Sequence, residues 1–129
     1  MNLPEGLDID YLIDDLRRLA WEASNIMLFY SNQFRNEKAK KDLIKTKDNN
    51  EPVTLADLEV NDLIINHIRE KYQKVKWHLL SEENGMIKFN NEETNINWLW
   101  VLDPLDGTRD FLQSTGDYAL HLALNYKNK

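Results

Sequence analysis

The 129-residue sequence contains no cysteine, and this absence excludes several kinds of chemistry at once. Disulfides, thiol catalysis, zinc–thiolate sites and iron–sulfur clusters all depend on cysteine. No apolar run approaches the roughly 18 residues that a membrane span needs. The first ten residues, MNLPEGLDID, have neither the basic region nor the apolar core of a signal peptide. We therefore expect a soluble, cytoplasmic protein without a membrane span.

The chain also lacks an excess of basic residues. Lysine and arginine number 16 and aspartate and glutamate 22, so the formal net charge is −6. A sequence-independent nucleic-acid binder needs a basic face, so we expect no nucleic-acid polymer as a partner. A small phosphorylated substrate remains compatible with this balance, because a bound metal ion can invert the local field. The composition, 42% hydrophobic and 29% charged, is that of a globular domain or part of one.

The apolar residues of the N-terminal half recur at helical spacing. From Asp8 to Gln33 they follow steps of three and four, which predicts a helix with one apolar stripe. Charged residues, among them Asp14 and Asp15, lie largely off that stripe. A second helix is predicted from Thr54 to about Glu70–Gln73, because Thr54-x-x-Asp57 has the form of an N-terminal cap.

The C-terminal half reads mainly as strands. The apolar run Trp98–Leu102 has strand length, and we expect it to be covered on both faces. Other predicted segments are a strand at Trp77–Leu80, a loop or hairpin at Ile87–Asn97, a helical turn at Arg109–Gln113 and an alternating strand at Tyr118–Tyr126. The order predicts an α+β fold, a layered α/β sandwich with two N-terminal helices packed on a mainly antiparallel sheet.

Acidic residues follow the most apolar strand directly. Asp103 and Asp106 flank the main-chain carbonyl of Leu105 in the turn Asp103-Pro104-Leu105-Asp106-Gly107-Thr108. Proline restricts this turn and glycine permits its sharpness. Such hard oxygen ligands suit Mg²⁺, Mn²⁺ or Ca²⁺. The alternative is an ordinary turn, since Asp-Pro and Asp-Gly are common turn dipeptides.

Two further acidic segments can likewise be interpreted as functional or as purely structural. Glu82 and Glu83 follow a predicted strand, and adjacent carboxylates favour a cation; alternatively they form a solvated acidic loop. Asp57 is either a functional carboxylate or a helix cap alone.

Taken together and in order, these segments resemble the inositol monophosphatase superfamily. The chain carries Thr54-x-x-Asp57, then Ser81-Glu82-Glu83, then the complete signature W-x-x-D-P-x-D-G-T-x-x-F from Trp100 to Phe111. Pro52–Asp57 and Arg109–Phe111 look most like the 3′(2′),5′-bisphosphate nucleotidase branch. The resemblance implies the N-terminal part of the sugar-phosphatase fold and a magnesium-dependent phosphomonoesterase. Its substrates would be adenosine 3′,5′-bisphosphate-like nucleotides, which lose their 3′-phosphate to a metal-activated water.

The resemblance also implies a role for each motif residue. Glu82, Asp103, Asp106 and the carbonyl of Leu105 would hold two or three Mg²⁺ ions, for which Mn²⁺ can substitute. Glu82, Asp57 and Thr108 would be catalytic by positioning and polarising the attacking water, and Gly107 and Thr108 would bind the substrate phosphate. Lys45 or Lys47 could correspond to a family lysine near the active site, with a solvated basic face as the alternative.

The chain departs from the family in length, since family members are about twice as long. No W-D-x-A-type motif, which completes the family's metal site, occurs here. We therefore expect residues 1–129 to form an N-terminal metal-binding domain whose C-terminal domain is absent. The missing half, a second chain or a second copy would complete it. Two alternatives stay open: an inositol-1-monophosphate phosphatase, and a truncated, non-catalytic metal-binding or interaction module.

Overall fold

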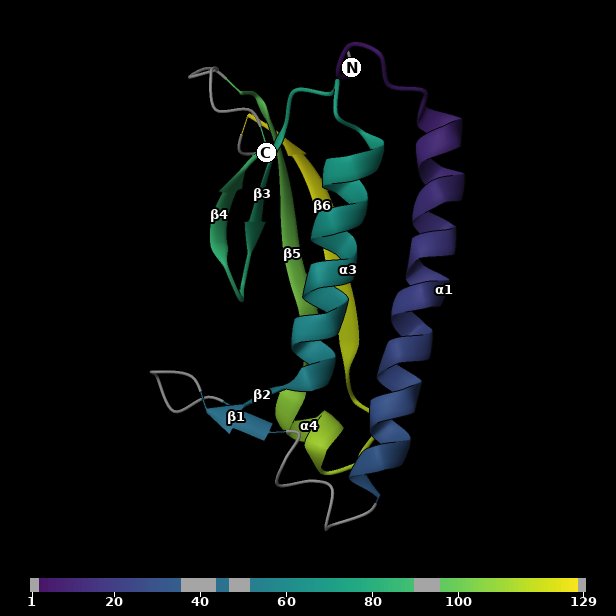
Figure 1. Cartoon of the computed structure of the whole chain (residues 1–129), viewed down its shortest axis with the longest axis vertical. Coiled ribbons are helices and arrows are strands. Elements are labelled where there is room, and N and C mark those ends of the chain that lie inside the picture. Colours follow the sequence, from purple (N-terminus) through teal and green to yellow (C-terminus); the bar gives the residue numbers. More distant parts are fainter. Residues whose placement is uncertain (1–2, 36–43, 47–51, 90–95, 128–129) are drawn as a thin grey trace.

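The computed structural model describes residues 3–35, 44–46, 52–89 and 96–127. Helices and strands alternate along the chain and gather into layers (Figure 1). The elements are α1 (Ile9–Phe34), β1 (Ile44–Thr46), β2 (Pro52–Thr54), α3 (Leu55–Lys71), β3 (His78–Ser81), β4 (Gly85–Lys88), β5 (Trp98–Asp106), α4 (Thr108–Leu112) and β6 (Ala119–Tyr126).

Helix α1 begins where the apolar spacing predicts. The side chain of Asp8 caps it by accepting hydrogen bonds from the backbone N–H groups of Asp10 and Tyr11, at 3.0 and 3.1 Å. One side of the helix is buried, through Leu12, Leu19, Ala23, Met27, Tyr30 and Phe34. The prediction of this helix is confirmed, although Ile9 and Ile13 share the apolar spacing and are 42% and 41% exposed.

Helix α3 starts with a capping box. The backbone N–H of Thr54 donates to Oδ2 of Asp57 at 2.9 Å, and the N–H of Asp57 donates back to Oγ1 of Thr54 at 3.3 Å. This exchange satisfies two backbone donors that a helix start leaves unpaired. The helix ends at Lys71, inside the range that the sequence predicts.

Four strands form the main sheet in the order β4-β3-β5-β6, and β1 and β2 form a separate antiparallel pair. Strand β3 runs parallel to β5, while the β3–β4 and β5–β6 pairs are antiparallel. The prediction of a mainly antiparallel sheet is thus confirmed, with one parallel pair at its centre. Because β3 and β5 run parallel, their C-terminal ends point toward the same end of the sheet.

Both long helices cover one face of this sheet. Helix α3 lies over β5, and α1 packs beside α3 (Figure 1). Trp98, Trp100 and Leu102 of β5 are buried, and the ring of Trp100 meets that of Trp77 edge to face at 5.2 Å. These aromatic contacts contribute to the core between helices and sheet.

The expectation that Trp98–Leu102 is covered on both faces is wrong for the described residues. Burial alternates along β5, so that Leu99 and Val101 are only partly buried. Helices cover one face of the sheet, and the described part of the chain places no layer over the opposite face. The apolar run in β5 is therefore buried on one side only. In β6, Leu120, Leu122 and Leu124 alternate with exposed residues, as predicted.

The structure also shows the predicted helical turn and the predicted hairpin. The helical turn near Arg109–Gln113 is confirmed as α4, and the polar segment after Gly85 begins as the outer strand of the β3–β4 hairpin. Lys47 and residues 36–43 of the basic stretch lie outside the described residues. None of the described helices combines the length and hydropathy that crossing a membrane requires.

Asp15 is the main exception to the predicted helix stripe. The sequence places it off the apolar side of α1, yet its side chain is only 2% exposed. It accepts hydrogen bonds from three groups on or next to α3: Nε2 of His67 at 2.7 Å, Nζ of Lys71 at 2.5 Å and the hydroxyl of Tyr72 at 2.5 Å. Burial alone would raise the pKa of Asp15, but these hydrogen bonds lower it to about 2. This carboxylate joins the two long helices.

Candidate metal and phosphate site

The acidic segments meet at one end of the sheet because of the parallel pairing of β3 and β5. Glu82 follows β3 directly, and its backbone N–H donates to the carbonyl of Leu102 in β5 at 3.0 Å. Asp103 and Asp106 lie in the last part of β5. The start of α3, which carries Asp57, faces the same end, where α4, β2 and the end of β5 lie together (Figure 1).

Asp57 and Thr108 are hydrogen-bonded to each other across 51 residues of sequence. The hydroxyl of Thr108 lies 3.1 Å from Oδ1 of Asp57 and 3.1 Å from the carbonyl oxygen of Leu105. Oδ2 of Asp57 is occupied by the backbone N–H and the hydroxyl of Thr54, at 2.9 and 2.6 Å. Asp57 is 1% exposed, so this buried carboxylate is held by the cap on one oxygen and reached by Thr108 on the other.

Gly107 occupies the sharp turn between β5 and α4. Its φ of 82° lies in the left-handed region, which favours glycine. A Cβ atom at this position would lie 2.4 Å from the backbone oxygen of Asp117. Glycine is therefore required twice, by conformation and by space, and its N–H is presented at the start of the short helix that carries Thr108.

Glu82, Asp103 and Asp106 form the acidic part of the site. Burial raises the pKa of Asp103 to about 6, and Glu82, within hydrogen-bonding reach, and the charge of Asp106 add to the increase. A hydrogen bond from the backbone of Leu105 opposes this shift. Within the described residues, Oδ1 of Asp103 is buried without a hydrogen-bond partner. Among the described residues, the ionised form of Asp103 is therefore disfavoured, because burial and the neighbouring carboxylates outweigh its one backbone donor.

The donor chemistry fits a hard divalent cation. Carboxylate oxygens and a main-chain carbonyl are the ligands that Mg²⁺, Mn²⁺ and Ca²⁺ prefer, and the buried oxygen of Asp103 has no competing partner in the described chain. The arrangement is incomplete, however, because no group of three Asp, Glu or His side chains in the described ranges is spaced to hold an ion. The carbonyl of Leu105 also accepts the Thr108 hydroxyl, although a carbonyl oxygen keeps a second lone pair.

One neighbour of the site was not predicted from the sequence. Nε2 of His121 lies 3.8 Å from Oδ2 of Asp106, with both side chains exposed. His121 faces Asp103 in the β5–β6 register, and only this pairing brings it there. The other two histidines lie elsewhere: His67 is on α3, where it contacts Asp15, and His78 is at the start of β3.

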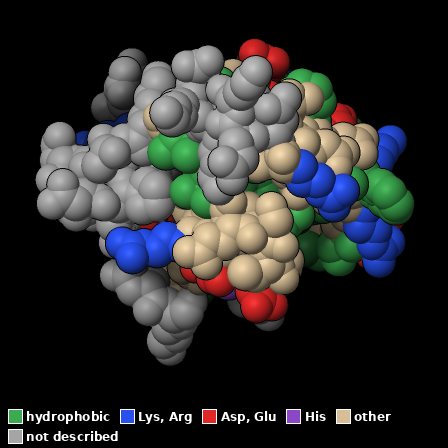
Figure 2. Space-filling model, turned by 90° about the horizontal axis from the view of Figure 1, so that it is seen from below, with side chains coloured by type: hydrophobic (Ala, Val, Ile, Leu, Met, Phe, Trp, Pro, Cys, Tyr) green, Lys and Arg blue, Asp and Glu red, His purple; other side chains and the backbone are tan. Residues whose placement is uncertain are grey.

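The described surface at the α4 end of the molecule is mixed in charge. Viewed from the α4 end, the coloured part of the molecule shows red acidic, blue basic and green hydrophobic side chains interspersed (Figure 2).

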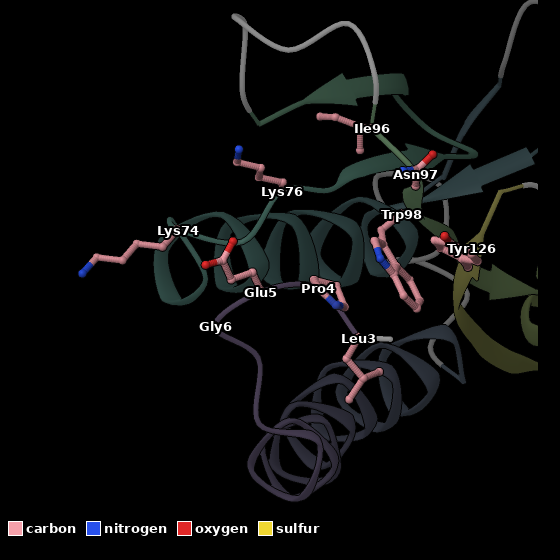
Figure 3. Close-up of a pocket in the computed structure, with 10 residues that line it drawn as sticks. All are labelled: Leu3, Pro4, Glu5, Gly6, Lys74, Lys76, Ile96, Asn97, Trp98 and Tyr126. Atoms are coloured by element: carbon pink, nitrogen blue, oxygen red, sulfur yellow. The ribbon is translucent and has the colours of Figure 1, made fainter. Parts of the chain in front are cut away.

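A cavity of about 510 Å³ lies elsewhere, at the start of β5, where Lys74, Lys76, Trp98 and Tyr126 contribute to its lining (Figure 3). Because β5 is nine residues long, roughly 26 Å separate that cavity from Asp106. The cavity is therefore no part of the acidic site.

Comparison with known proteins yields one consistent family. A model described as "Inositol monophosphatase family" matches residues 8–129. The chain is similar to the 3′(2′),5′-bisphosphate nucleotidase CysQ of Haemophilus influenzae, with 31% identity over 93% of this chain and 41% of that protein. It is also similar to the Nus factor SuhB of Vibrio cholerae, with 31% identity over 72% of this chain and 33% of that protein.

A solved structure supports the fold. The extragenic suppressor protein suhB of Bartonella henselae superposes with a TM-score of 0.73 and 22% identity, over 92% of this chain and 42% of that one. The chain thus spans between about a third and two-fifths of the length of these relatives.

Proposed function

The chain belongs to the inositol monophosphatase family, and on this basis we propose that residues 1–129 form the N-terminal metal-binding domain of a magnesium-dependent phosphomonoesterase. The substrate class we propose is adenosine 3′,5′-bisphosphate-like nucleotides, which would lose their 3′-phosphate. Similarity to CysQ proteins of several bacteria supports this choice. The observation that carries the proposal is the under-compensated carboxylate of Asp103 beside Glu82 and Asp106.

In this proposal the acidic residues and one carbonyl hold the metal. Glu82, Asp103, Asp106 and the carbonyl of Leu105 would be the ligands. Bound Mg²⁺, two or three ions that Mn²⁺ could replace, would neutralise the phosphate oxygens and acidify the attacking water. The neighbouring carboxylates around the buried Asp103 would give these residues their affinity for a cation.

Asp57 and Thr108 would orient the water. The Thr108 hydroxyl has acceptors within reach at Asp57 and Leu105, so its proton is directed inward and its oxygen lone pairs stay available for a water proton. Because the Asp57 carboxylate is held by Thr54, it keeps Thr108 in one orientation. The N–H of Gly107 and the hydroxyl of Thr108 would contact the substrate phosphate, with no covalent intermediate on the protein.

Phosphate release tests the proposal. We expect the longest gene product that contains this chain to release phosphate from adenosine 3′,5′-bisphosphate, dependent on Mg²⁺, and in preference to inositol 1-phosphate. Asp106→Asn should abolish this activity, while Asp117→Asn, at an exposed position outside the ligand set, should leave it unchanged. Unchanged activity in Asp106→Asn would refute the ligand assignment, and preference for inositol 1-phosphate would favour the second enzyme type.

A second candidate is a metal-binding or interaction module without turnover. One observation favours it: the described acidic residues do not complete a three-residue metal cluster. It predicts that the 129-residue chain binds Mg²⁺ while phosphate appears only at the rate of the buffer. Metal-dependent release by this chain alone would exclude it.

A further inference from the structure

A buried amide lies behind the acidic residues and takes no part in the helix cap. Asn61 is one turn beyond Asp57 on α3 and is 1% exposed. Burying an amide without partners destabilises a fold, so buried polar side chains in native structures are almost always hydrogen-bonded. The partners of Asn61 therefore indicate what it does.

Asn61 joins α3 to the turn between β3 and β4. Its Oδ1 accepts a hydrogen bond from the hydroxyl of Ser81, and its Nδ2 donates to Oδ1 of Asn84 at 2.5 Å. The Ser81 oxygen accepts the backbone N–H of Glu83 at 3.1 Å. Because that oxygen already accepts a proton, its own hydroxyl proton points to Asn61, which fixes the orientation of the amide.

Glu82 lies inside the turn that these hydrogen bonds hold. Its backbone N–H donates to the carbonyl of Leu102, one residue before Asp103. The turn is thus attached to α3 through Asn61 and to β5 through Leu102. The side chain of Glu82 is exposed, and its carboxylate lies within hydrogen-bonding reach of Asp103. The two attachments of the turn therefore set the position from which this carboxylate reaches Asp103.

We infer that Asn61 is a positioning residue that holds the β3–β4 turn so that the Glu82 carboxylate faces Asp103, and that it thereby sets the affinity of this pair for a divalent cation. The inference rests on the proposed metal role of Glu82 and Asp103. Groups that orient metal ligands commonly contribute about 10- to 100-fold to affinity. Because Asn61 acts through the backbone of the turn, we expect a loss of about tenfold on its truncation.

Mn²⁺ binding measured by electron paramagnetic resonance on the intact 129-residue chain tests this inference without requiring turnover. Asn61→Ala should weaken binding about tenfold. Asn84→Ala, at an exposed position, should fold like the parent and weaken binding in the same direction by a smaller factor. The matched controls are Ile64→Val, fully buried on the same helix, and Met86→Ala, exposed on the same hairpin; both should bind Mn²⁺ like the parent.

A second readout separates positioning from general loss of stability. Exchange of the Glu83 backbone amide with deuterium should accelerate in Asn61→Ala and not in Ile64→Val, because only the first variant removes the partner of Ser81. If both Asn61→Ala and Asn84→Ala bind Mn²⁺ as tightly as the parent, the positioning role is overturned and the metal site stands. If the parent itself binds no Mn²⁺, the proposed metal site falls, and the positioning role falls with it.

Discussion

The carboxylates of Asp15 and Asp103 are both partly or fully removed from water, but their electrostatic environments are opposite. Asp15 accepts hydrogen bonds from three donors and its pKa is lowered to about 2. Asp103 has other carboxylates as neighbours, keeps an oxygen without a partner in the described chain, and has its pKa raised to about 6. The fold compensates the first charge and leaves the second in excess. A carboxylate that its own fold does not compensate is a candidate for binding a cation, whereas a compensated one is structural.

Replacing Asp15 should have the largest effect on stability. In Asp15→Ala the Tyr72 hydroxyl and His67 lose their acceptor between α1 and α3, and we expect a loss of about 3 kcal/mol in the free energy of unfolding. Denaturant titration measures it. Asp14→Ala is the matched control: Asp14 is 65% exposed and pairs with Arg17 on the surface, which corresponds to a loss below about 0.5 kcal/mol. Equal losses at the two positions would contradict the role assigned to Asp15.

The pH dependence of stability should have opposite signs for the two carboxylates. The folded pKa of Asp15, about 2, lies below its ordinary value of 3.8, so its stabilisation is present above about pH 4 and is lost toward pH 2. This loss should amount to about 2 kcal/mol. The folded pKa of Asp103, about 6, lies above 3.8, so the fold weakens as the pH rises from about 4 to 6.

Melting in metal-free buffer between about pH 2 and 7 measures both slopes. Asp15→Asn should remove the low-pH loss, and Asp103→Asn should remove the weakening at higher pH. A variant whose profile stays parallel to that of the parent would contradict the assignment of that carboxylate.

Adding Mg²⁺ should stabilise the parent through the uncompensated carboxylates. A ligand that binds only the folded state at ten times its Kd contributes about 1.4 kcal/mol. The melting temperature with and without MgCl₂ at matched ionic strength measures this. Asp15 variants should keep the response, since their change lies at the other carboxylate, and Asp103→Asn should lose it. An equal response in Asp103→Asn would place the bound ion elsewhere.

The smallest expected effect is a gain. Without metal and at neutral pH, Asp103→Asn removes a charge that the fold disfavours, and we expect about 1 kcal/mol of added stability after allowance for solvent screening. Denaturant titration in a chelating buffer measures it, with exposed Asp117→Asn as the control that should not change. A loss of stability in Asp103→Asn would show that this carboxylate is compensated after all.

The sequence predicted local structure better than distant pairings. Both long helices and the strand β6 follow from apolar spacing, and Thr54-x-x-Asp57 predicted the capping box, because these signals act over a few residues. Asp15 was predicted to lie off the apolar stripe, and its burial was not foreseen, since its partners lie 52 to 57 residues away on or next to α3. The position of His121 likewise depends on strand register, which no local pattern contains.

The sequence predicted which residues belong to the candidate site but not how they are arranged in space. The acidic segments were found because their motifs are contiguous, and the structure shows the Asp57–Thr108 hydrogen bond between two of them. Their catalytic roles stay predictions. The role of Asn61 has no signal in the sequence, because a buried asparagine has no periodic pattern that separates it from its apolar neighbours. The prediction that Trp98–Leu102 is covered on both faces was wrong. An apolar run shows that a strand is hydrophobic but does not show how many layers pack against it.

The Asp57–Thr108 hydrogen bond also has a consequence for the order of folding. The capping box of Asp57 closes over three residues, whereas the contact with Thr108 spans 51. Short loops cost less entropy to close than long ones, so the helix start forms on local information while the contact with Thr108 waits for β5 to dock. We therefore expect the candidate site to form late in folding, so that binding of a cation there would report completion of the tertiary structure rather than formation of the helices.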